Sequence, residues 1–115
     1  LLLNPVPLTE EALLRGKDRY DIFCIVCHGP KGQGNGPATG TNPVTQVPRF
    51  PTPPSLHTEQ AREYADGTIY HIITQGQGQM PGYSDKLTEE DRWKVIHYVR
   101  ALQRAMNPRP EDLEP

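Results

Sequence analysis

The sequence predicts an all-α fold with a long helix near each end and long proline-rich loops between them. Two segments, about residues 9–23 and 89–105, carry apolar side chains at spacings of three and four, which is the period of one helix face. Most of the 13 prolines in this chain of 115 residues lie between the two segments, in residues 30–54. No segment is a convincing strand.

A chain of this length is one domain, and we divide residues 1–115 into a lead-in (1–8), a core (9–105) and an acidic, proline-rich tail (106–115) that we expect to be loose. So small a chain buries a limited core, so a covalent staple or an apolar cofactor would help it to fold. The net charge of -2 argues against a nucleic-acid-binding protein. No apolar run is long enough to cross a membrane, and the three opening leucines are too short for a signal peptide or an anchor.

The first helix begins after Thr9, a good N-cap, with acidic residues in its first turn, and runs to about Phe23. Gly16 shares a face with Tyr20 and costs the helix roughly 0.5–1 kcal/mol relative to alanine. Close approach of a second helix would explain the glycine, and the alternative is an accidental glycine on the surface.

Three more helices follow the long loop. Thr58 predicts a short helix over 59–65, and Asp66-Gly67 breaks the chain before a helix over 68–75. Thr88 begins a capping box for the last helix, from Glu89 to about Ala105. The third helix is expected to face inward with its isoleucines: Ile69, Ile72 and Ile73.

The string Cys24-Ile25-Val26-Cys27-His28 is the attachment signature of c-type haem. Two thiols three residues apart on a helical turn lie on one side, where each can add to one haem vinyl group. The next residue, His28, then presents an imidazole to the iron. A disulfide between the cysteines would close too short a loop to gain much, a thioredoxin-like pair expects a βαβ context, and a zinc site would need further paired ligands.

The second axial ligand of the iron decides the function, and Met80 is the best candidate. It lies in the glycine-rich turn 76–83 and is followed by a proline, an odd place for a core methionine. We expect Met106, at the end of the last helix, to make an apolar contact only. Of the histidines, His71 is the serious rival, although a partly exposed side chain is the simpler reading. His57 could also reach the iron from its loop, whereas we expect His97 to be solvated. A His/Met pair closes the coordination sphere and favours electron transfer over catalysis.

The loop from Gly29 to Leu56 makes sense if it wraps a flat prosthetic group and packs on it. Its glycines do not make a phosphate-binding loop, because no Gly-Lys-Ser or Gly-Lys-Thr is present and no strand precedes them. The prolines also lower the entropy of the unfolded chain, a device common in heat-stable proteins.

With these motifs the sequence resembles the class I cytochromes c. The resemblance implies that the N- and C-terminal helices pack together around one covalent haem c and its iron, with Gly16 and Tyr20 against the last helix. It also implies that a proline carbonyl, best matched by Pro37, accepts the ring N–H of His28. Maturation outside the cytoplasm follows from the same resemblance, so the periplasm or an outer membrane face is expected.

The sequence also resembles, less specifically, the monohaem cytochrome subunit of alternative complex III. This resemblance rests on residues 20–23, 32–37, 73–83 and 90–102. This resemblance implies a monomeric periplasmic carrier that passes single electrons from a quinol-oxidising membrane complex to a terminal haem–copper oxidase. It would meet the membrane only through its partners or an anchor outside this sequence. The alternatives are the related haem domain of an oxidase, or a small haem peroxidase or sensor with a labile sixth ligand.

Charge is unevenly distributed. Residues 29–56 contain Lys31 and Arg49 and no acids, and residues 74–84 contain no charge. If these loops frame the haem edge, the docking face is nearly neutral, and docking is hydrophobic and weakly sensitive to salt. Arg49, and with less support Tyr64, are candidates for contact with the haem propionates.

Overall fold

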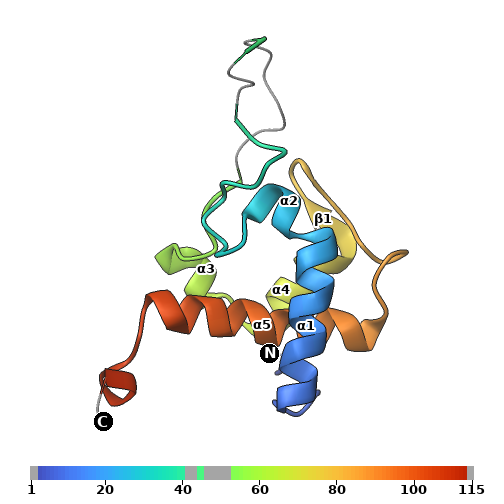
Figure 1. Cartoon of the computed structure of the whole chain (residues 1–115). Helices are drawn as coiled ribbons and strands as arrows, with labels where there is room; N and C mark the ends of the chain where they lie inside the picture. Colours follow the sequence, from blue (N-terminus) through green and yellow to red (C-terminus); the bar gives the residue numbers. More distant parts are fainter. Residues whose placement is uncertain (1–2, 41–43, 46–52, 114–115) are drawn as a thin grey trace.

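A computed structural model describes residues 3–40, 44–45 and 53–113. Of residue 113 it describes the backbone alone. The fold is mostly helical, as predicted (Figure 1). Its elements in chain order are α1 (Glu10–Phe23), α2 (Ile25–His28), α3 (Glu59–Glu63), α4 (Asp66–Gln75), β1 (Gly76–Gln77), β2 (Met80–Pro81), α5 (Glu89–Met106) and the 3-10 helix η1 (Pro110–Leu113).

The crossing of α1 over α5 organises the molecule (Figure 1). A Cβ atom on Gly16 would overlap the backbone carbonyl of Lys94, so only glycine lets the two helices approach this closely. One turn later Tyr20 is fully buried, and its ring lies 5.2 Å from that of Tyr98. The helix contact that the glycine predicted is therefore confirmed.

The apolar core is small and lies where α1, α4 and α5 meet. Ile73 is buried, whereas Ile69 and Ile72 are half-buried, so only one of the three isoleucines faces fully inward. Tyr70 of α4 stacks on Trp93 of α5 at 4.2 Å between ring centroids. The buried hydrophobic cluster consists of Tyr20, Ile73, Leu87, Val95, Ile96 and Val99.

Threonine hydroxyls cap three helices, as the sequence predicted. The side chains of Thr9, Thr58 and Thr88 accept hydrogen bonds from the backbone N–H three residues on, at 3.0–3.1 Å. Each cap satisfies one of the N–H groups that a helix start leaves without a partner.

Three expectations about the elements were wrong. Asp66-Gly67 does not break the chain but forms the first turn of α4, where the Asp66 carboxylate accepts a hydrogen bond from Arg100 at 2.9 Å. The preceding helix, α3, is shorter than expected and ends at Glu63. A two-residue antiparallel ladder, β1–β2, also forms where we found no strand.

Side-chain bonds fasten the described parts of the lead-in and of the tail to α5, although we expected the tail to be loose. The side chain of His97 is half-buried, with Nε2 2.6 Å from the carbonyl oxygen of Val6, so this histidine fixes the lead-in and is not simply solvated. In the tail, η1 is tied to α5 by a two-pronged bond from Arg104 to Asp112 at 2.7 and 2.6 Å. That bond holds the pKa of Asp112 down at about 2. Along the described part of the chain, no helix combines the length and the apolar character needed to span a bilayer.

Candidate haem site

The two cysteines lie at the corner between α1 and α2. Cys24 ends α1, where its N–H donates to the Tyr20 carbonyl, and its own carbonyl accepts from the N–H of His28 at 2.9 Å. The motif therefore occupies a separate helical turn, as its spacing predicted. Both thiols are free and half-buried, and they do not form the disulfide considered above. Burial, with Cys27 beside it, raises the pKa of Cys24 to about 12 and keeps this thiol protonated.

His28 ends this turn, and one nitrogen of its ring is left without a partner, as is Nδ1 of His57. Nδ1 of His28 is buried and has no hydrogen-bond partner within the described part of the chain. Such orphaned polar atoms are rare in proteins and call for an explanation. Burial also lowers the pKa of His28, so the ring is neutral, the form that binds a metal. A half-buried, neutral imidazole beside two free thiols fits a covalently attached haem.

The glycine-rich segment after the motif folds back onto α2. The N–H groups of Gly34, Gly36 and Ala38 donate to the carbonyls of His28, Cys27 and Val26 at 2.8, 3.0 and 2.9 Å. A Cβ atom on Gly36 would overlap the Val26 carbonyl, so this return is open to glycine alone. Sequence reasoning treated these glycines as a loop signal and missed this role, which their alternation could have suggested.

The same return carries Pro37 past the motif, between two residues bonded to α2. The hydrogen bond that we expected from His28 to the Pro37 carbonyl is not made in this structure, since Nδ1 of His28 has no partner among the described residues. Arg49 lies outside the described residues. The backbone carbonyl of Tyr64 accepts a hydrogen bond from Arg100. Tyr64 also lines a shallow hollow beside α3.

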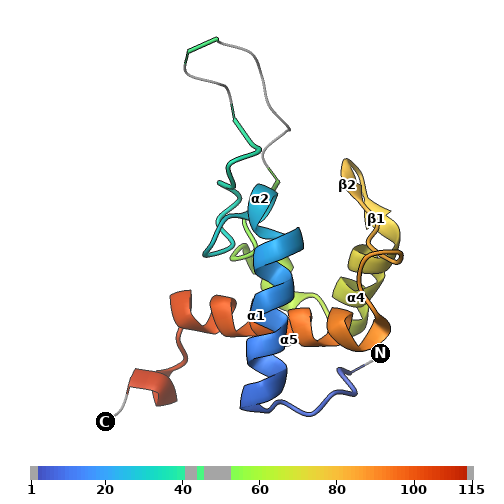
Figure 2. The same ribbon diagram turned by 45° about the vertical axis from the view of Figure 1, so that its right-hand side comes forward.

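Met80 lies on the hairpin that follows α4. It pairs with Gln77 in the β1–β2 ladder, and the N–H of Tyr83 donates to the Ile73 carbonyl at 2.8 Å, which closes the base of the hairpin. Residues 76–83, which we expected to form a turn without a strand, thus contain a short paired ladder, and Met80 is half-buried. The hairpin and α2 rise on the same side of α5 and face each other (Figure 2).

Tyr83 connects the hairpin to the cysteine motif, which sequence reasoning did not foresee. Its hydroxyl donates to the Phe23 carbonyl at 3.2 Å, and its ring meets that of Phe23 edge-on at 6.1 Å. Burial and the proximity of Cys24 and Cys27 raise the pKa of Tyr83. The structure therefore brings Met80's hairpin and the motif to one end of the molecule.

The other candidate ligands are exposed or have contacts elsewhere. His71 is exposed, and Nε2 of His57 lies 2.5 Å from the Lys31 carbonyl. Met106 is exposed, with its sulfur 3.9 Å from the Gln33 amide nitrogen. Across residues 3–40, 44–45 and 53–113, no three His, Cys, Asp or Glu side chains gather as a zinc site would need.

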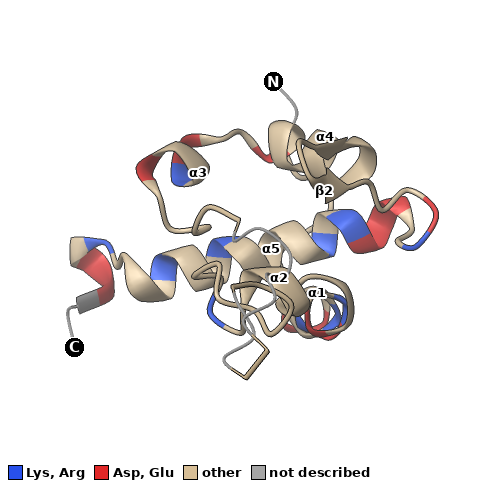
Figure 3. Cartoon of the chain, turned by 90° about the horizontal axis from the view of Figure 1, so that it is seen from above, with Lys and Arg blue, Asp and Glu red and all other residues tan. Residues whose placement is uncertain are grey.

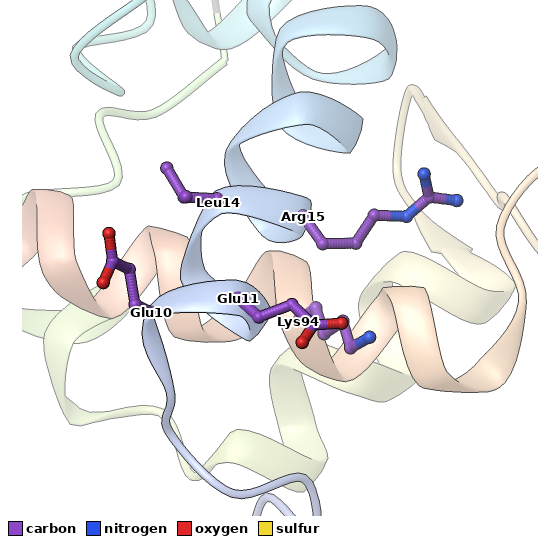
Figure 4. A pocket seen from close by; sticks show the side chains of 5 residues that line it. All are labelled: Glu10, Glu11, Leu14, Arg15 and Lys94. Atoms are coloured by element: carbon purple, nitrogen blue, oxygen red, sulfur yellow. The ribbon is translucent and has the colours of Figure 1, made fainter.

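A hollow of about 690 Å³ between α1 and α5 is unrelated to the motif (Figure 4). Four of its lining side chains are charged and the fifth is an exposed leucine, which does not suit a flat apolar group. They are Glu10, Glu11, Leu14, Arg15 and Lys94.

Known proteins share both the sequence pattern and the fold. Residues 11–99 match the family described as cytochrome c oxidase, cbb3-type, subunit III. A structure of the reducing HAO-like protein complex Kustc0457/Kustc0458 of Kuenenia stuttgartiensis is similar over 88% of this chain, with a TM-score of 0.65 and 29% identity. This chain spans about half of the matching one, 49% of its length.

The c-type cytochrome KustC0563 is similar over 76% of this chain and 96% of its own, with a TM-score of 0.59 and 22% identity, and so supports the fold alone. The comparison with curated proteins gave no match. The family match covers most of the core and includes Cys24, Cys27, His28 and Met80. The chain therefore belongs to the cytochrome c oxidase, cbb3-type, subunit III family, and with it to the c-type cytochromes, which carry electrons on covalently bound haem c.

Proposed function

We propose that the protein is a single-electron carrier with one haem c, attached through Cys24 and Cys27 and ligated by His28 and Met80. The observation that carries this proposal is that the neutral imidazole of His28 stands in the attachment motif beside the free thiols of Cys24 and Cys27. The methionine hairpin on the same side of α5 supports it (Figure 2).

The chain's own groups suit this task. The two thiols would form the thioether bonds, and the neutral ring of His28 would bind the iron through Nε2 while Nδ1–H donates to the Pro37 carbonyl. That bond would fix the ring and strengthen it as a ligand. Arg49 is our candidate for the propionates. When bound, the haem supplies an iron that takes up and releases one electron.

Ligation by Met80 distinguishes a carrier from an enzyme. A thioether on the sixth position leaves no open site for oxygen or peroxide and raises the reduction potential relative to two histidines. The second candidate is a haem domain that works inside an oxidase, and the description of the matching family favours it. A peroxidase or a sensor would need a labile Met80 bond.

We further propose a place in a respiratory chain, in the periplasm or on the outer face of the membrane. A quinol-oxidising membrane complex would be the donor and a terminal haem–copper oxidase the acceptor, as the resemblance to the alternative complex III subunit implies. The similar Kuenenia stuttgartiensis chain belongs to a protein complex, which supports a physical association with redox partners.

The proposed docking face is the end that carries α2 and the hairpin. Seen from above, this end is almost free of the charged residues that mark α3 and both ends of α5 (Figure 3). The side chain of Val26 is 41% exposed there, next to Cys27. A neutral, partly apolar surface suits brief contacts with membrane-bound partners.

The test replaces each of the two methionines of the chain. Met80→Ala should lower the reduction potential, remove the weak long-wavelength band that marks methionine–iron coordination in ferric cytochromes c, and admit cyanide or carbon monoxide. Met106→Ala is the matched control and should change none of these, because its side chain is exposed near Gln33. An unchanged potential and spectrum in Met80→Ala would refute the ligand assignment.

A further inference from the structure

Arg92 of α5 is a buried arginine whose guanidinium bonds to neutral groups. The residue is 8% exposed, and within the described part of the chain no carboxylate lies at ion-pair distance from it. A buried charge is costly unless its hydrogen-bond donors are satisfied. Its partners therefore indicate why an arginine stands here.

Those partners lie on both sides of the hairpin that carries Met80. On the outgoing side, Nε donates to the Leu87 carbonyl at 3.1 Å and Nη2 to the Ser84 carbonyl at 3.0 Å. On the incoming side, Nη1 donates to the Tyr70 hydroxyl at 3.0 Å and lies 3.5 Å from the Thr74 hydroxyl. One planar group thus holds the chain where it enters and leaves the hairpin.

The hairpin itself adds little that could fix Met80. Its ladder has two residues in each strand, Gly76–Gln77 and Met80–Pro81. Below the ladder, the Tyr83–Ile73 backbone bond at 2.8 Å closes the base. The Arg92 guanidinium contacts the next residue on each side, Thr74 and Ser84. A short ladder is marginal without support from the rest of the fold.

We infer that Arg92 is a positioning residue for Met80: it fastens both ends of the hairpin to α5 and so holds the thioether where it binds the iron. This inference rests on the proposed function, because it assumes that Met80 is the sixth ligand. Lysine cannot replace the arginine, because an ammonium lacks the rigid fork that reaches three directions at once.

Arg100 provides a matched control on the same helix, two turns further on. It also joins α5 to a preceding segment, since Nε donates to Asp66 at 2.9 Å and Nη1 to the Arg62 carbonyl at 3.3 Å. Its contacts hold the start of α4, however, and leave the hairpin alone. Loss of Arg100 should therefore lower stability without loosening Met80.

The experiment measures the affinity of the ferric holoprotein for imidazole, which competes with Met80 for the iron, together with the reduction potential and the melting temperature. Arg92→Gln and Arg92→Lys should both raise the affinity about tenfold, equal to about 1.4 kcal/mol. Arg92→Gln should also lower the potential. Arg100→Gln should melt earlier with unchanged affinity and potential.

The outcomes separate the two proposals. If Met80→Ala leaves affinity and potential unchanged, the ligand assignment itself fails. If Met80→Ala changes both but the Arg92 variants match the wild type, or Arg100→Gln raises the affinity equally, the positioning role of Arg92 fails.

Should Arg92→Gln not fold with haem, Tyr70→Phe removes one hydroxyl partner and keeps the ring stacked on Trp93. It should raise the affinity in the same direction by a smaller factor, and an unchanged value would overturn the inference.

Discussion

Single residues decide what this fold can hold. His28 is half-buried and has a buried ring nitrogen without a partner among the described residues, and Gly36 lets the following segment return along α2. The first feature leaves an imidazole ready for a metal. The second brings the backbone around Pro37 to the same place. The unpartnered nitrogen of His28 does not stabilise the chain, whereas the return after the motif is held by backbone hydrogen bonds to α2.

Gly16 gives the residue-scale prediction. In Gly16→Val the new side chain would meet the Lys94 carbonyl, a backbone atom that cannot move without shifting α5. We expect a loss of about 1–3 kcal/mol in the free energy of unfolding, in the range of other overpacked sites. Guanidinium titration of the holoprotein measures it.

Leu14→Ala is the control for this change, because Leu14 lies on the same helix and is 59% exposed. Its free energy of unfolding should stay within about 0.5 kcal/mol of the wild type. Equal stability of Gly16→Val and the wild type would show that the helices do not cross as closely as described.

At the scale of elements, an ion pair joins α1 and α5 in addition to their apolar contacts. The Arg15 guanidinium donates to both carboxylate oxygens of Asp91, each at 3.0 Å. The hydrogen bond from Arg15 lowers the pKa of Asp91 below the ordinary 3.8. The Arg15–Asp91 pair therefore adds to the stability of the fold above the pKa that Asp91 has in the unfolded chain. This stabilisation is lost as the pH falls through the lower pKa of the folded state.

Asp91→Asn should accordingly be less stable than the wild type at neutral pH, and the difference should shrink below about pH 4. Thermal melts of the holoprotein between neutral and acidic pH measure this. Asp85→Asn, at an exposed loop position, is the control and should follow the wild type. A difference between Asp91→Asn and the wild type that stays constant with pH would exclude the pair as its cause.

At the scale of the whole molecule, charge is segregated. The helices and the tail hold most of the acids and bases, and the end with α2 and the hairpin is nearly neutral (Figure 3). A partner that docks at this end meets little net charge. Screening by salt, whose range is about 8 Å at physiological ionic strength, then has little to act on.

We therefore expect electron exchange to depend only weakly on ionic strength. Stopped-flow oxidation of the reduced protein by one anionic and one cationic metal complex provides the test, and both rates should change little from low to physiological salt. Lys31→Glu is a useful comparison, because it places a negative charge in the loop after the motif. Steep and opposite salt dependences for the two reagents with the wild type would contradict a neutral face.

The sequence by itself determined the local features: three helix caps, the extents of α1 and α5, the haem motif and the methionine that stands apart in a glycine-rich turn. These depend on residues within a few positions of one another, so pattern and spacing suffice. The break predicted at Asp66-Gly67 was wrong for the opposite reason. These residues form a helical turn, and the Asp66 carboxylate bonds to Arg100, which is distant in the sequence and cannot be recognised from local residues.

Only the tertiary structure decided how these pieces serve one another. The bonds of Arg92 to the hairpin, of Tyr83 to the end of α1 and of His97 to the lead-in join residues 5 to 91 positions apart. No periodicity or spacing encodes most of such pairs, because each follows from the way α1, α4 and α5 pack. The local sequence thus determines the chemical groups of the site, whereas the packing of the helices determines where the hairpin that carries Met80 lies.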